Sequence, residues 1–126
     1  MRKMGIDFGT KKVGIALTDE AGQMAFPHAV VPNDTALLGL VEQLIAEKEV
    51  AEVVIGHSKN LDGSDNPLQA AIEEFIGDMT LRVSVPIHLE PEQFTSAAAA
   101  RTTGKNEMTD AAAAALILET YLQKQR

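Results

Sequence analysis

An aspartate inside an apolar alternation constrains this chain more than any other feature. Residues 4–8 and 13–17 alternate apolar and other side chains, which predicts two strands joined by a hairpin turn at 9–12. Aspartate is depleted in strands, and a buried carboxylate is costly unless it is paired or bound to a metal. Asp7 is therefore either solvated at a strand end or part of a site. The glycines before and after it would let a phosphate approach the backbone closely.

Composition limits the chain to one globular domain, which we place at residues 1–126. Its hydrophobic content of 45% is typical of globular proteins, and no apolar run is long enough to span a membrane. The absence of cysteine excludes disulfides and thiolate metal ligands, and the N-terminus has no signal-peptide pattern. We expect a cytoplasmic protein with no membrane partner, and its oligomeric state stays open.

The formal charge of −7 disfavours nucleic-acid binding, because phosphate contacts supply most of the non-specific affinity. A local basic patch, or divalent metals held by acidic residues, would still allow it, since either one reverses the local charge. If nucleic acid binds, the charge indicates a confined site rather than a broad basic surface.

Apolar periodicity predicts an α/β domain with a mixed sheet. Further strands are expected at 24–31, 52–56 and 86–90, and helices after the capping residues Asn33 or Asp34, Asn66, Thr95 or Ser96, and Thr109. Pro27 indicates an edge position for the third strand, and the nearly all-apolar fourth strand indicates a central one. The polar segment at 57–66 lies where α/β sheets place ligand crevices, although a plain surface connection would have the same composition.

Three acidic positions recur at the ends of predicted elements: Asp7, the pair Glu90 and Glu92, and Asp110. The apolar stripe at i+4, i+7 and i+11 from Asp110 places this residue on the sheet-facing side of the last helix, although helix-end acids also serve as plain caps. Converging carboxylates repel one another unless a cation lies among them, and hard divalent metals prefer oxygen ligands. Histidine spacing supports no zinc site, and only His57, at a strand exit, is placed to contact a substrate.

Three segments in this order resemble the YqgF/RuvX family of pre-16S rRNA nucleases related to Holliday-junction resolvases. Residues 5–19 are similar to the family's opening strand pair, 54–56 with 60–64 to its fourth strand and following loop, and 110–118 with 121–122 to its closing helix. The resemblance covers essentially the whole chain. It implies an RNase H-like fold, with a mixed five-stranded sheet whose first three strands are antiparallel, flanked by helices.

The resemblance also implies a Mg²⁺- or Mn²⁺-dependent carboxylate site. Asp7 corresponds to the first-strand acid, Asp110 to the closing-helix acid and Glu92 to the middle acid, with Glu90 as a substitute. Where the family has Asp-Glu-Arg, this chain has Pro91-Glu92-Gln93, and His57-Ser58 replaces Leu-Pro. The substrate-binding residues implied are Thr10, Lys11, Lys12, His57 and Lys59.

We therefore expect a metal-dependent endonuclease that acts on structured RNA during ribosome maturation, with branched DNA as the alternative substrate. Two other classes stay open. An ATP-binding phosphotransferase of the actin-like superfamily shares a similar hairpin but needs two such domains. A catalytically silent binding module would lack a carboxylate, and all three are present.

Overall fold

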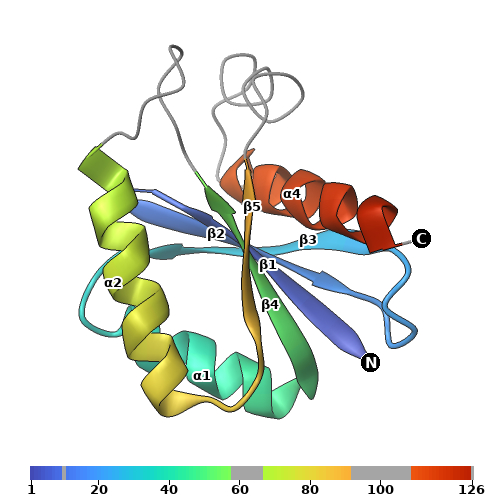
Figure 1. Cartoon of the computed structure of the whole chain (residues 1–126), viewed down its shortest axis with the longest axis horizontal. Helices are drawn as coiled ribbons and strands as arrows, with labels where there is room; N and C mark the ends of the chain where they lie inside the picture. The colour runs from blue at the N-terminus through green and yellow to red at the C-terminus, as the bar shows by residue number, and fades with distance from the viewer. Residues whose placement is uncertain (10, 58–66, 92–108, 126) are drawn as a thin grey trace.

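The computed structural model describes residues 1–9, 11–57, 67–91 and 109–125, with the backbone alone at 57, 67–69, 91, 109–110 and 125 (Figure 1). Its elements are β1 (Arg2–Phe8), β2 (Lys12–Thr18), β3 (Ala25–Pro32), α1 (Leu37–Glu47), β4 (Val50–His57), α2 (Pro67–Arg82), β5 (Ile87–Pro91) and α4 (Thr109–Gln125). No helix among these residues has the length and apolar character needed to cross a membrane.

The five strands form one mixed sheet in the order β3-β2-β1-β4-β5. Strand β2 pairs antiparallel with both β1 and β3, whereas β4 pairs parallel with β1 and β5. The mixed sheet, its antiparallel opening and the edge position of the third strand are confirmed. Pro27 follows a shift in the β2–β3 register, because a residue without an N–H is tolerated at an edge or a bulge.

Helices cover the sheet on both faces. Helices α1 and α2 lie on one side, and α4 crosses the other (Figure 1). Strand alternation divides the core accordingly: Met4, Ile6 and Phe8 of β1 join the cluster under α1 and α2. On the opposite face, Ala16 and Val54 join the smaller cluster under α4. The side of β1 that carries Asp7 is therefore the side that α4 covers.

The cap predicted for the first helix is wrong. Helix α1 begins at Leu37, its N-cap is Ala36, and no side chain caps it. Asp34 instead accepts a hydrogen bond from the backbone N–H of Ala36, two residues on, which is a local turn rather than a cap. The side-chain amide of Asn33 donates a 2.7 Å hydrogen bond to the carbonyl of Gly9 and so holds the β1–β2 turn. The short helix expected after Thr95 or Ser96 lies outside the described residues.

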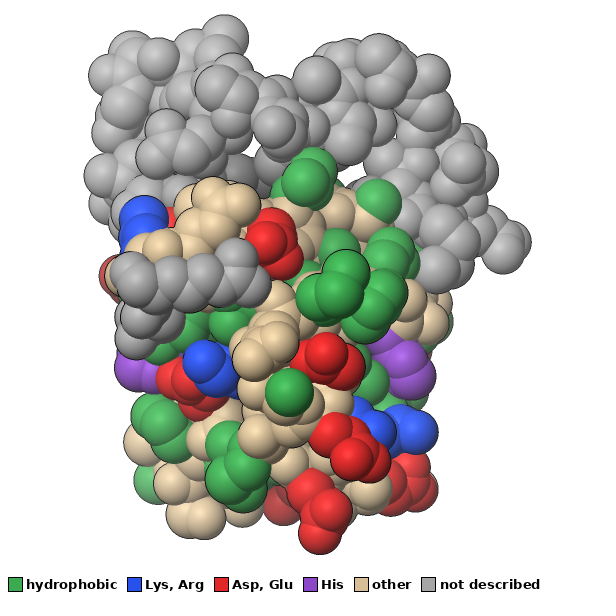
Figure 2. All heavy atoms as spheres, turned by 90° about the vertical axis from the view of Figure 1, so that its right-hand side faces the viewer, with side chains coloured by type: hydrophobic (Ala, Val, Ile, Leu, Met, Phe, Trp, Pro, Cys, Tyr) green, Lys and Arg blue, Asp and Glu red, His purple; other side chains and the backbone are tan. Residues whose placement is uncertain are grey.

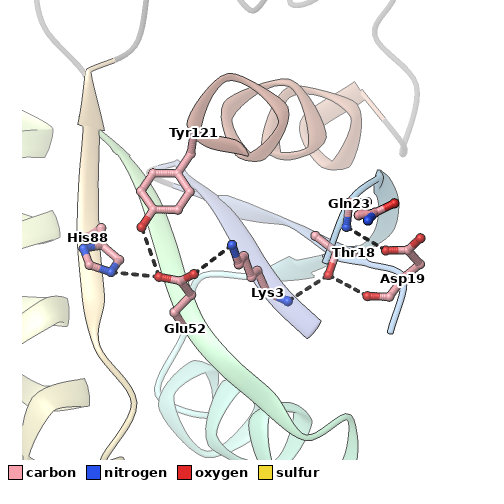
Figure 3. A network of polar contacts seen from close by, with 7 residues as sticks. All are labelled: Lys3, Thr18, Asp19, Gln23, Glu52, His88 and Tyr121. Atoms are coloured by element: carbon pink, nitrogen blue, oxygen red, sulfur yellow. Dashed lines mark hydrogen bonds and ion pairs between the residues drawn. The ribbon is translucent and has the colours of Figure 1, made fainter. Parts of the chain in front are cut away.

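A polar network joins α4 to the sheet (Figure 3). Glu52 on β4 lies 3.1 Å from the Lys3 ammonium and 3.0 Å from the His88 ring nitrogen, and accepts a 3.0 Å hydrogen bond from the Tyr121 hydroxyl. His88 also stacks on the Tyr121 ring, with centroids 5.3 Å apart. Partial burial raises the pKa of Glu52, but the hydrogen bonds from Lys3 and Tyr121 outweigh this and lower it overall. Strands β1, β4 and β5 thus share one anchor with α4.

Close packing of α4 makes Gly5 sensitive to substitution. A Cβ at Gly5 would lie 2.7 Å from the carbonyl oxygen of Ala114 and 2.9 Å from the Cβ of Leu118, so backbone would have to move. We expect Gly5→Ala to lower the free energy of unfolding by about 1–3 kcal/mol, measured by denaturant titration. Gly39→Ala is the matched control in α1, where nothing lies within 4 Å of an added Cβ. It should stabilise by about 0.5–1 kcal/mol through helix propensity, and equal effects at the two positions would contradict this packing.

The polar network should be visible in the titration of Tyr121. Burial, together with the hydrogen bond to Glu52, raises the pKa of Tyr121 from 10.0 to about 12. Because the folded pKa is raised, the stabilisation is complete below pH 10 and is lost as the pH rises towards 12. Tyr121 is the single tyrosine and the chain has no tryptophan, so ultraviolet absorbance reports its ionisation alone.

The matched control for this titration is Glu52→Gln, which removes the negative charge that disfavours tyrosinate. In this variant the midpoint of the Tyr121 titration should move back towards pH 10. Circular dichroism at each pH separates ionisation in the folded state from alkaline unfolding. A parent midpoint near 10 while the fold persists would show that the hydrogen bond does not form in solution.

Candidate functional site

Asp7 is a buried carboxylate in a row of residues that crosses the whole sheet. Only 5% of the surface of Asp7 is exposed. Asp7 pairs with Gly14 on β2, which in turn pairs with Val30 on β3. On the other side, the β1–β4 register continued by one residue sets Asp7 level with Gly56, which pairs with Glu90 on β5. Glycines therefore flank Asp7 on both neighbouring strands, so no side chain from either crowds its carboxylate.

Helix α4 approaches this row closely. A Cβ at Gly56 would lie 2.5 Å from the Cδ1 of Ile117, so the Ile117 side chain covers the bare backbone between Asp7 and Glu90. Ala114 and Ile117, at i+4 and i+7 from Asp110, are both buried against the sheet. The predicted sheet-facing stripe is confirmed at these positions. Asp110 lies in the first turn of α4, where its backbone is described, and its side chain lies outside the described residues.

Glu90 is the second buried acid of the row, also 5% exposed. The ammonium of Lys124, in the last turn of α4, contacts its carboxylate at 2.5 Å. Sequence reasoning missed Lys124, although it lies seven residues after Ile117 and so continues the same helical stripe. Glu90 thus already has a protein cation as its partner.

The β1–β2 turn presents two adjacent cations at the same end of the sheet. Lys11 and Lys12 are both exposed. The backbone here is held to the end of β3, because the N–H of Asn33 donates to the carbonyl of Lys11 at 2.9 Å and its side chain binds Gly9. Gly9 itself lies against Lys12, since a Cβ there would be 2.4 Å from the Lys12 carbonyl oxygen.

Several predicted site residues are not tested. Thr10, Lys59 and Glu92 lie outside the described residues, and His57 is described only as the last residue of the backbone of β4. Within the described part of the chain, no group of three or more His, Cys, Asp or Glu side chains could hold a metal ion. The described carboxylates of the row, Asp7 and Glu90, are oxygen donors of the type that Mg²⁺ and Mn²⁺ prefer.

Figure 2 views the molecule from the right-hand side of Figure 1, where acidic side chains are interspersed with apolar, basic and histidine side chains. The acidic side chains are in keeping with the net charge of −7, which does not attract a polyanion.

Comparison with known proteins identifies close relatives over the full length of the chain. The family model RuvX, described as "Holliday junction resolvase", matches residues 1–124. A Maridesulfovibrio salexigens protein named "Putative pre-16S rRNA nuclease" is 35% identical, covering 98% of this chain and 99% of its own. A Lachnospira eligens protein of the same name is 31% identical, covering 100% and 99%.

Among solved structures, Thermus thermophilus RuvC in complex with a Holliday junction substrate has the same fold. Its TM-score is 0.66 at 15% identity, and the match covers 99% of this chain and 96% of that one. At this identity the likeness concerns the fold alone, and it confirms the RNase H-like class expected from the sequence.

The ion pair between Glu90 and Lys124 should contribute to the stability of the fold, and substitutions at the two residues can test this. Lys124→Met leaves the buried Glu90 carboxylate without its cation, and we expect it to destabilise the fold by about 1–3 kcal/mol in chemical denaturation. Adding Glu90→Gln to that variant removes the stranded charge and should restore much of the loss. Strictly additive effects of the two substitutions would mean that the contact contributes nothing.

Proposed function

This chain belongs to the RuvX family, and we propose that it is a metal-dependent endonuclease that hydrolyses phosphodiester bonds in structured RNA, in the 5'-end processing of pre-16S rRNA. The observation that carries the proposal is the position of Asp7. It is a buried carboxylate flanked by glycines, on the face covered by the helix that carries Asp110. The relatives named for pre-16S rRNA nuclease activity match over nearly their whole length and support the same substrate.

In this proposal Asp7, Glu92 and Asp110 hold Mg²⁺ or Mn²⁺. Such ions lower the pKa of bound water and neutralise charge on the attacking and leaving oxygens of a phosphodiester. Gly14, which pairs with Asp7 on β2, has no side chain, so a phosphate can come close to the Asp7 carboxylate on that side. Lys11 and Lys12 contact phosphates of the substrate, and Thr10, His57 and Lys59 are assigned to the same role from the family resemblance.

Glu92 is a better middle acid than Glu90. The Lys124 ammonium already compensates the charge of Glu90, and a metal would have to displace it. Glu92 follows Pro91, the last residue of β5, whose carboxyl end lies beside that of β4 in the sheet. Glu90 and Lys124 then position β5 relative to α4 rather than hold the ion.

Branched DNA is the second candidate substrate, favoured by the family description and by the fold shared with a junction-bound resolvase. A four-way junction has to be cut at two symmetric positions, so a resolvase would need a second copy of this chain. Processing of RNA at one position needs only one. The proposed RNA-processing role fits a cytoplasmic location, which we include in the proposal.

The central test is cleavage by the parent protein and by Asp7→Asn. A pre-16S rRNA fragment and a four-way DNA junction are each incubated with Mn²⁺ and with a chelator. We expect Mn²⁺-dependent cleavage of the RNA, reduced about 100-fold or more in Asp7→Asn because a metal ligand is lost. Asp78→Asn, the same substitution on α2 across the sheet, is the control and should keep parental activity. Cleavage of the junction alone by a dimer would support the resolvase instead.

Thermal melting tests the metal site without relying on activity. Without metal, Asp7→Asn should melt at a higher temperature than the parent, because it relieves repulsion among the converging acids. Millimolar Mn²⁺ should raise the melting temperature of the parent more than that of the variant, since an ion that binds only the folded state stabilises it. Equal protection of both proteins would argue against Asp7 as a ligand.

A further inference from the structure

A pocket of about 350 Å³ lies beside the β1–β2 turn, at the free edge of the sheet. Its described lining combines two cations with an apolar floor: Lys11, Lys12, Val30, Val31 and Pro32. The volume is at the lower end of the range of about 300–1,000 Å³ for small-molecule sites. This size suits one nucleotide unit and is too small for a base-paired duplex.

The two lysines are unusual in this acidic chain because no described acid compensates them. Most described basic side chains are paired: Arg2 with Glu20, Lys3 with Glu52, Arg82 with Glu42, and Lys124 with Glu90. Across residues 1–9, 11–57, 67–91 and 109–125, neither Lys11 nor Lys12 has an ion pair with a carboxylate. Within the described residues their charge is uncompensated, and a phosphate is the group that matches it.

Part of the pocket lining is on the same face as Asp7, whereas Val31 packs against the cluster on the other face, so the pocket lies around the sheet edge. Lys12, Val30 and Pro32 alternate with residues that face α1, so they share the Asp7 side of the sheet. Only Gly14 lies between Val30 and Asp7 in the row. Lys12 is the diagonal neighbour of Asp7 across the β1–β2 pair, with Cα atoms about 7–8 Å apart in such a geometry. A phosphate at Lys12 would thus be a near neighbour of one at Asp7.

The pocket is also preorganised. Three of its lining residues, Val30, Val31 and Pro32, belong to β3, and Asn33 holds the turn that carries the lysines through bonds to Gly9 and Lys11. Little chain has to be ordered when a ligand binds, which lowers the entropic cost of binding. Val30 and Pro32 offer apolar contact to a sugar or base, which a paired base inside a duplex could not make.

We propose that this pocket is a binding site for one unpaired nucleotide of the substrate strand, next to the phosphate that is cleaved. Lys11 and Lys12 bind its phosphate, and Val30 and Pro32 contact its sugar and base. The inference rests on the proposed nuclease function and deepens it. The substrate must be single-stranded at this position, even where the surrounding RNA is folded.

Binding in Ca²⁺, followed by fluorescence anisotropy, tests the site without turnover. The probes are a short single-stranded RNA, the same RNA with one abasic nucleotide, its blunt duplex and a nucleoside monophosphate. We expect the single strand to bind best and the abasic and duplex probes to bind more weakly. A monophosphate that competes as well as the strand would overturn the proposal in favour of a free-nucleotide pocket.

Two variants separate the charged and apolar parts of the pocket. Lys11→Ala with Lys12→Ala should reduce the slope of log affinity against log salt by about 1.4, since each single-strand phosphate contact contributes about 0.7. Val30→Thr keeps the shape and the β-propensity of the site but replaces a methyl group by a hydroxyl. It should weaken binding of the single-stranded RNA about fourfold and leave the salt slope unchanged. Binding of the abasic probe should be weakened less.

Lys48→Ala is the matched control, because Lys48 also lacks an ion pair within the described residues but lines a pocket with Arg2 and Glu49. It should leave both affinity and slope unchanged, and thermal melting checks that each variant is folded. If RNA cleavage depends on Asp7 while neither pocket variant affects binding, the pocket assignment is wrong and the nuclease function stands. If both variants behave as expected but the parent cleaves nothing, the nucleotide site stands and the proposed catalysis is wrong.

Discussion

The close contact between α4 and the sheet is the constraint on which the site depends. A helix normally keeps its distance from a sheet because side chains from both fill the space between them. Here Gly5 and Gly56 remove the side chains on two adjacent strands, and Ala114 and Ile117 take the space. Helix α4 thereby packs directly on the face of the sheet to which Asp7 belongs. The same glycines that weaken a strand locally make room for the helix.

Polar contacts then fix the direction of α4, which apolar packing alone leaves free to slide. Tyr121 and Lys124 on the helix meet Glu52 and Glu90 on β4 and β5. Hydrogen bonds and ion pairs depend more strongly on geometry than apolar contacts do, so they select one orientation of the helix. The second half of α4 is an anchor, and its first half carries the acid of the proposed site.

The sequence predicted those features that depend on local patterns. Alternation around Asp7 placed it in a strand, and Pro27 placed its strand at the edge, because both signals act within a few residues. The role of Asn33 could not be predicted, since it matches the local pattern of a cap and yet binds Gly9, 24 residues away. The partnership of Tyr121 with Glu52 spans 69 residues and leaves no periodic signal. The functional roles assigned to all the site residues, Asp7 and Asp110 included, remain predictions.

Helix α4 is held by its polar contacts at Tyr121 and Lys124 and by its packing at Ala114 and Ile117, so a change at one contact would tilt the helix as a rigid body. From Tyr121 to Asp110 the axis spans about 16 Å, at about 1.5 Å per residue, and a tilt of roughly 5° would move one end relative to the other by about 1.4 Å. Displacements of this size at a reacting centre can cost about 100-fold in rate. If the proposed site is correct, a residue remote from it, such as His88, would influence turnover through the orientation of α4. Variation among the residues that hold α4 would then change the catalytic rate without changing any of the proposed acids.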